Sequence, residues 1–170
     1  MLFDQLIVYF SFSTGQIFAT AFATAVKAKS FHYTLSIMQD TNIAMKIHVK
    51  EPAPDHFVFE ASKQTLKASR TLCCALLIGH LGNHTIEEVI TLLKEIPLTL
   101  PDIDKDVDVR FRCRVFLKQC IRTLSSAGIV NCKDANAVVN GELRELAIKQ
   151  SEAILTGTGA YIIAQSQISS

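Results

Sequence analysis

The sequence predicts an α+β fold, with a small, mostly antiparallel sheet in the first third of the chain and a helical region after it. The strand pattern is clearest over residues 31–38 and 43–50, where apolar side chains alternate with smaller or more polar ones. The segment 39–42 between them, QDTN, has the composition and length of a hairpin turn. Residues 56–61 supply a third strand, so we expect a sheet with one apolar face and one wet face.

The spacing of apolar residues changes to a helical period near Ser62. Ser62 is a suitable N-cap for a helix that reaches about Leu81, where Gly-Asn follows. Thr85 with Glu88 has the capping-box pattern, which predicts a second helix ending before Pro97.

The last third predicts one more helix, from about 141 to 155, and a turn and strand in GTGAYIIAQ, residues 157–165. The 170 residues fit one domain, 1–170, and no linker or repeat divides it. Its softest internal boundary is the β-to-α change near residue 62.

The N-terminal segment 5–26 carries no charged residue. Residues 6–12 are β-branched and aromatic and suit a strand, and a helix is predicted after the STGQ turn because Phe18, Phe22 and Val26 recur every four residues. A signal peptide or membrane anchor is the alternative, but the run lacks a basic flank and is diluted by Ser and Thr. A buried strand and helix is therefore the favoured interpretation. It implies an intracellular protein, and membrane binding is expected only if residues 5–26 are an anchor.

The stretch 104–120, DKDVDVRFRCRVFLKQC, fits two periods. Alternation over 106–115 suggests a strand, but the helical spacing continues for four turns, so we predict a helix over 108–125 with aspartates at its start. The helical stripe consists of Val109, Cys113, Phe116, Leu117, Cys120, Ile121 and Leu124.

A basic stripe runs beside this apolar stripe, because four cations are spaced four residues apart on the predicted helix. They are Arg110, Arg114, Lys118 and Arg122. One interpretation is a solvated face neutralised by nearby aspartates, and the other is a contact for phosphate or an acidic partner. We also expect apolar contact surfaces for a partner at Phe111, Val115, Phe18 and Phe22.

The run HTIEEVITLL, a connector, and VFLKQCIRTLSSAGIV together resemble the end of a winged-helix unit, over roughly residues 84–132. The resemblance implies a short helix, a second helix with apolar and basic residues, and a tight exit into a strand. In that family the second helix commonly enters the DNA major groove, although many members bind proteins instead. The sequence NCKDANAVVNGE after Val130 does not have the composition of a basic two-stranded wing.

Composition excludes some classes of protein. An apolar fraction of 49% with 19% charged residues excludes a disordered chain. A net charge of +1 excludes an overall electrostatic attraction of the protein to nucleic acid or to anionic membranes. Five cysteines without a repeated C-x-x-C spacing argue against a disulfide framework and a structural zinc site.

No catalytic, cofactor or metal site is predicted. His80 and His84 are separated by Gly-Asn, which should break a shared helix, and Cys73-Cys74 lies in the most apolar run of the chain. The glycine-rich TGTGA, residues 156–160, follows a helix and precedes a strand, which is the reverse of a phosphate-binding loop.

These patterns favour a non-catalytic protein interaction or assembly module, which would be a subunit of a homo- or hetero-oligomer, because catalytic groups are lacking and apolar residues are in excess. The first alternative is a winged-helix-type nucleic-acid-binding protein that uses the basic helix edge. The second is a small enzyme with a site that no motif marks. The expected partner is a protein or a second copy of the chain, with no cofactor, in the cytoplasm.

Overall fold

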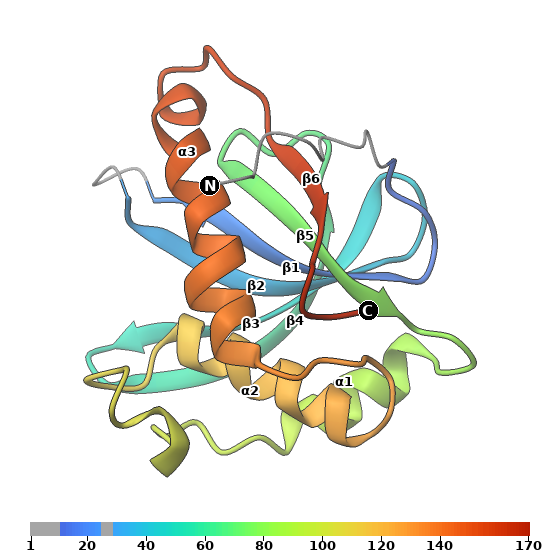
Figure 1. Ribbon diagram of the computed structural model, residues 1–170, viewed down its shortest axis with the longest axis vertical. Helices are drawn as coiled ribbons and strands as arrows, with labels where there is room; N and C mark the ends of the chain where they lie inside the picture. The colour runs from blue at the N-terminus through green and yellow to red at the C-terminus, as the bar shows by residue number, and fades with distance from the viewer. Residues whose placement is uncertain (1–10, 25–28) are drawn as a thin grey trace.

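The structure is a computed structural model that describes residues 11–24 and 29–170 (Figure 1). In these residues the chain forms one six-stranded sheet and three α-helices, which confirms the α+β fold. The elements are β1 (Gln16–Ala23), β2 (Phe31–Met38), β3 (Ile43–Ala53), β4 (His56–Thr65), β5 (Leu72–His80), α1 (Ile86–Lys94), α2 (Cys113–Ser126), α3 (Arg144–Leu155) and β6 (Ile162–Gln165). The strand order is β4-β3-β2-β1-β5-β6, and only the β5–β6 pair is parallel.

Strands β2, β3 and β4 form the antiparallel meander that the alternating pattern predicts. Leu35 pairs with Ile47 across β2 and β3, and the QDTN segment turns between the two strands. Asp40 fixes that turn, because its Oδ1 accepts the backbone N–H groups of Asn42 and Ile43, each at 2.7 Å.

The predicted helix after the STGQ turn is wrong, because residues 16–23 form strand β1 at the centre of the sheet. All eight residues of β1 are buried, so the strand has no polar face to reveal a period of two. Phe18 and Phe22 are four residues apart, which places them on one side of a helix and equally on one face of a strand. The predicted strand 6–12 lies almost wholly outside the described residues, as does Val26.

The predicted helix over residues 62–81 is also wrong. Strand β4 continues through Ser62 to Thr65, and after a turn the chain forms β5, of which only the last residue is exposed. The sheet therefore extends to His80, and helices begin only after that point. The single-domain prediction is untested and stays a prediction.

The later elements follow the sequence more closely. Helix α1 begins after Thr85, whose side chain accepts the N–H of Glu88 while the Glu88 side chain accepts the N–H of Thr85, so the capping box is confirmed. Helix α2 begins at Cys113, later than the predicted start at 108, and a 3-10 turn at Asp102–Asp104 precedes it. Before α3 the chain winds as a π-helix over Ala137–Leu143, and β6 follows as predicted.

The helices cover one face of the sheet, where α2 packs across β2 and β3 and α3 packs across β1 and β5 (Figure 1). The main hydrophobic core lies between them. The opposite face is only partly wet, because a second buried cluster covers it along β1, β5 and the adjoining ends of β2 and β3. Along the rest of β2, β3 and β4 this face carries polar residues such as Thr34, His48 and Glu60. The second cluster consists of Phe12, Phe18, Phe22, Met38, Ala44, Leu66, Leu72, Ala75 and Leu77. Both faces of the central strands are therefore buried, which absorbs part of the apolar excess of the sequence.

The two helices of the winged-helix resemblance are present, but the chain after α2 takes another course. Residue Asn131 exchanges backbone hydrogen bonds with Ser170, and Cys132 forms a bridge with Ser169. Among the residues that the structure describes, a two-stranded wing does not follow α2; the segment instead ties the C-terminus to the helical layer.

Candidate functional site

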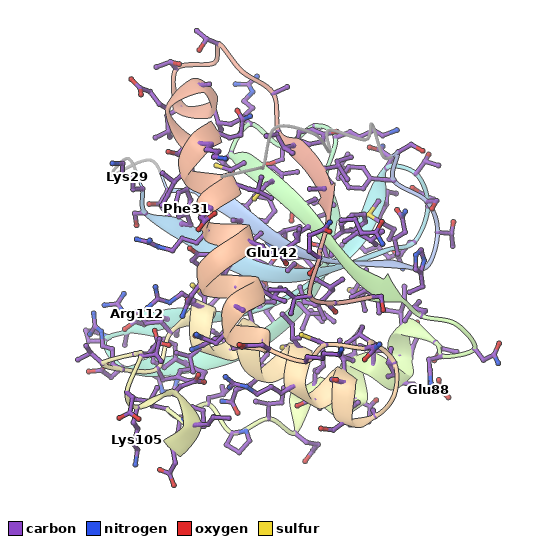
Figure 2. The ribbon with its side chains drawn as sticks, viewed as in Figure 1. Lys29, Phe31, Glu88, Lys105, Arg112 and Glu142 are labelled. Atoms are coloured by element: carbon purple, nitrogen blue, oxygen red, sulfur yellow. The ribbon has the colours of Figure 1, made fainter. Side chains whose placement is uncertain are left out.

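A pocket of about 880 Å³ lies at the end of the sheet where β2 begins, against the start of α2. Its walls come from the β1–β2 connection, the ends of β3 and β4, the segment before α2, and the π-to-α junction at Arg144. Lys29, Phe31 and Arg112 of this pocket lie on one side of the molecule (Figure 2). We call this pocket the basic groove.

The basic groove gathers positive charge in a chain whose charge is almost balanced. Six of its lining residues are cations, against the two acids Glu51 and Asp108, while the whole chain has 17 Lys and Arg against 16 Asp and Glu. The cations are Lys29, Lys50, Arg110, Arg112, Arg114 and Arg144. Because like charges repel, such a gathering favours an anion between them.

Only half of these cations have an acidic partner. Lys50 pairs with Glu60, Arg110 lies 3.6 Å from Asp55, and Arg114 pairs with Asp108. Within residues 11–24 and 29–170, Lys29, Arg112 and Arg144 form no ion pair, and all three are exposed.

The lining of the basic groove includes Tyr33, which is 5% exposed and whose hydroxyl makes no hydrogen bond to a described residue. Burial raises the pKa of Tyr33 to about 12, although the charges of Arg114 and Arg144 act in the opposite direction. The phenol therefore stays protonated at neutral pH and is available as a hydrogen-bond donor.

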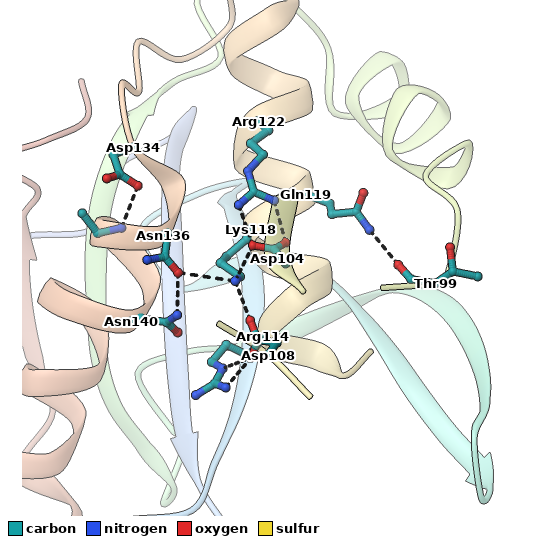
Figure 3. A network of polar contacts seen from close by, with 11 residues as sticks. Thr99, Asp104, Asp108, Arg114, Lys118, Gln119, Arg122, Asp134, Asn136 and Asn140 are labelled. Carbon is teal, nitrogen blue, oxygen red and sulfur yellow. Dashed lines mark hydrogen bonds and ion pairs between the residues drawn. The ribbon is translucent and has the colours of Figure 1, made fainter. Parts of the chain in front are cut away.

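A second group of charges, which we call the buried network, includes Asp108 and Arg114, which also line the groove (Figure 3). Lys118 is fully buried, and its Nζ lies 2.6 Å from Asp104 Oδ1 and 2.5 Å from Asp108 Oδ2. Arg122 donates two hydrogen bonds to Asp104, at 2.7 and 2.8 Å. Burial alone would raise the pKa of Asp104, but the hydrogen bonds from Arg122 and Lys118 outweigh it and lower that pKa.

The ion pairs of the buried network hold the segment 102–109 so that two of its charged side chains are buried and three apolar ones are exposed. Asp104 and Asp108 point inward and are 1% and 5% exposed, whereas Ile103, Val107 and Val109 are 70%, 50% and 100% exposed. Three exposed apolar side chains therefore lie within seven residues of one another in the sequence, on a segment held by buried ion pairs. We call this segment the inverted loop.

A chain of hydrogen bonds crosses the sheet next to the groove. His32 Nε2 lies 2.7 Å from His48 Nδ1, and His48 Nε2 lies 3.1 Å from Glu60 Oε1. The pKa of both rings is lowered, so both are neutral at neutral pH. With His48 neutral, its Nε2–H donates to Glu60, and its Nδ1 accepts the Nε2–H of His32. Burial is the largest cause that lowers the pKa of His32 to about 4, and the neighbouring His48 and Lys46 act in the same direction.

Other candidate chemistry is sparse in the part of the chain that the structure describes. That part holds no group of three His, Cys, Asp or Glu side chains placed to bind a metal, and none of its helices is long and apolar enough to cross a membrane. Cys73 and Cys74 are buried, and burial raises the pKa of both thiols, which disfavours the reactive thiolate.

The structure separates the residues of the predicted basic stripe. Arg110 and Arg114 line the basic groove, whereas Lys118 and Arg122 belong to the buried network and face aspartates. The prediction of a phosphate or partner contact at these four residues is untested.

The expected apolar contact residues are all inside the fold. Phe18 and Phe22 lie in the second cluster, and Phe111 and Val115 lie in the main core, each 6% exposed or less. As placed, they cover the protein's own sheet and leave little surface for a partner.

Sequence reasoning missed Tyr33, Lys29 and Arg144 as members of one site. Tyr33 alternates like any strand residue, and Arg144 is far from it in sequence. One signal was present: Arg110, Arg112 and Arg114 alternate in RFRCR directly before the helix, which concentrates charge at its N-terminal end.

Comparisons with protein-family models, with curated proteins and with solved structures found no match for this chain.

Proposed function

We propose that this chain is a non-catalytic binding module that takes a ligand with several phosphate groups in the basic groove. The observation that carries the proposal is the convergence of six cations on one pocket, three of them without an acidic partner among the described residues. Guanidinium groups match phosphate oxygens in charge and in hydrogen-bond geometry. Nucleic acid is one source of such a ligand, so this proposal moves the expected nucleic-acid contact from the helix edge to the groove.

The test measures binding of a fluorescently labelled polyphosphate chain by anisotropy over a range of salt concentrations. We expect affinity to fall steeply with salt, because each phosphate contact releases counterions. Arg112→Glu and Arg144→Glu should each weaken binding by roughly tenfold or more, since a charged hydrogen bond is lost and a repulsion is added.

Arg70→Glu is the matched control, because Arg70 is equally exposed but does not line the groove. A loss of affinity equal to that of the groove variants would mean that binding is non-specific and would contradict the proposal. An unlabelled oligothymidylate competitor then tells whether a nucleic-acid backbone is accepted.

The inverted loop favours a second candidate function, docking to a protein partner. The exposed Val109 directly precedes the exposed Arg110 in the chain, so the matching surface would have an apolar pocket with an acidic rim. This candidate keeps the interaction-module prediction but replaces the buried phenylalanines by Ile103, Val107 and Val109 as contacts.

Photo-crosslinking from position 107, with and without Val109→Asp, tests this docking. A defined crosslinked protein that Val109→Asp removes and Val58→Asp leaves in place would support it, because Val58 is exposed on β4 outside the loop. A crosslinked dimer of the chain itself would identify the partner as a second copy. Equal loss with both variants would rule out docking through the loop.

A further inference from the structure

We infer that the floor of the basic groove is a built subsite for one phosphate monoester group, held by the Tyr33 hydroxyl, the first turn of α2 and the side chains of Arg112 and Arg144. This inference rests on the proposed function and deepens it, because it places one phosphate of the ligand at a defined point of the groove.

Tyr33 supplies the first observation. Its side chain is almost wholly buried in the groove wall, yet its hydroxyl has no hydrogen-bond partner among the described residues. The two buried side-chain atoms that lack a partner in the described part of the chain are Gln64 Oε1 and Asn140 Oδ1. The Tyr33 oxygen is not one of them, so it keeps access to solvent through the groove that it lines.

A buried tyrosine normally finds a partner for its O–H group. Water can serve, but the hydroxyl lies in the field of Arg114 and Arg144, which favours an anionic acceptor. Because the phenol stays protonated at neutral pH, it donates to that acceptor and does not compete with it for positive charge.

Helix α2 supplies the second observation. It begins at Cys113 on the groove wall, and its N-cap, Arg112, makes no side-chain capping hydrogen bond. As in any α-helix, the first-turn N–H groups have no intrahelical carbonyl partner, and here the positive end of the helix dipole lies at the groove wall that Cys113 and Arg114 line. Backbone N–H groups at such a position bind phosphate oxygens.

The arginines set the charge of the group that fits. Arg114 is engaged by Asp108, so Arg112 and Arg144 are the guanidinium groups that remain for a ligand at this end of the groove. Two cations and a helix dipole balance a doubly charged phosphate monoester better than a singly charged carboxylate.

The experiment titrates the protein with inorganic phosphate and follows backbone amide shifts by NMR. We expect saturable shifts at Cys113, Arg114 and Val115, with acetate at the same ionic strength giving none. Tyr33→Phe and Arg144→Gln should each raise the dissociation constant for phosphate by roughly tenfold. Tyr161→Phe and Arg70→Gln are the matched controls outside the groove and should leave it unchanged.

Unchanged affinity in Tyr33→Phe, with native thermal unfolding, would overturn the subsite, as would shifts spread over the exposed lysines in place of the start of α2. If Tyr33→Phe does not fold, Arg144→Gln decides alone, because Arg144 is exposed and has no ion pair to lose among the described residues. If labelled polyphosphate binds and Arg112→Glu weakens that binding, but inorganic phosphate does not shift the amides of the first turn of α2, then the subsite is refuted and the proposed function stands. If neither binds, the proposed function falls with it.

Discussion

The buried network and the basic groove are both rich in cations and share Arg114. They differ in whether their other cations are buried against carboxylates or exposed without an acidic partner in the part of the chain that the structure describes. In the network each of Lys118 and Arg122 contacts a carboxylate, and Lys118 is fully buried. In the groove Arg112 and Arg144 are exposed and have no acidic partner within the described residues.

This difference separates two roles of the same residue types. Two carboxylates around one buried ammonium group determine where residues 102–109 lie, because moving any member leaves a buried charge without a partner. Exposed cations that gather without acids contribute no comparable contact and repel one another. The network therefore explains the local fold. The cations gathered in the groove have no such structural role, which is the reason for the proposed ligand.

The largest expected effect breaks the network. Lys118→Ala leaves Asp104 and Asp108 as neighbouring buried carboxylates with one cation removed, which should lower the free energy of unfolding by about 3 to 5 kcal/mol. Urea denaturation followed by circular dichroism measures this. Lys133→Ala, at an exposed lysine outside the network and the groove, is the control. A loss below about 1 kcal/mol for Lys118→Ala would mean that the network does not hold the segment as described.

A smaller effect on the free energy of unfolding, about 3 kcal/mol, is expected when the pH is lowered, because His32 beside the groove has a lowered pKa. The folded protein holds the pKa of His32 near 4, below its ordinary value of 6.5. Between these values the unfolded chain binds more protons, so this contribution to stability is complete above pH 6.5 and is lost as the pH falls toward 4.

His32→Gln keeps a donor toward His48 but cannot take up a proton, so it should make the slope of stability against pH shallower between pH 7 and 4. The remaining slope has two sources. One is His48, whose pKa is also lowered, mainly by burial, and the other, near pH 4, is carboxyl groups whose pKa is lowered in the folded protein, such as Glu60 and Asp104. The measurement is urea denaturation of both proteins at a series of pH values. Equal slopes for His32→Gln and the unaltered protein would show that the His32–His48 contact is not maintained in solution.

The sequence predicted the three strands of the meander, β2, β3 and β4, and helix α1, because each has a feature that only one structure explains. The strands alternate, and Thr85 with Glu88 marks a helix start. Strands β1 and β5 have no such feature, because every residue of β1 and nearly all of β5 is buried. Burial on both faces removes the alternation, and in a short apolar run the helix and strand periods cannot then be separated.

The candidate site was harder to predict for a different reason. Which cations are neutralised depends on the inverted loop folding back onto α2, and this brings Asp104 to Lys118 and Arg122 across 14 and 18 residues. The groove joins Lys29, Tyr33, Arg112 and Arg144, which come from three separate parts of the chain. Spacing within one helix predicts a stripe of charge, but only the tertiary fold decides which members face a carboxylate and which face solvent.

Removing Arg112 and Arg144 of the groove should have the smallest effect on the free energy of unfolding. The double variant Arg112→Ala, Arg144→Ala removes two exposed cations that lack an acidic partner among the described residues, so unfolding free energy should change by no more than about 0.5 kcal/mol. A slight gain is the expected direction, because repulsion around the groove is relieved. Urea denaturation at low and at high salt measures both, since screening should abolish any gain. A loss of more than about 1 kcal/mol would instead place these arginines among the residues that hold the fold, and the groove would then no longer need a ligand to explain its charge.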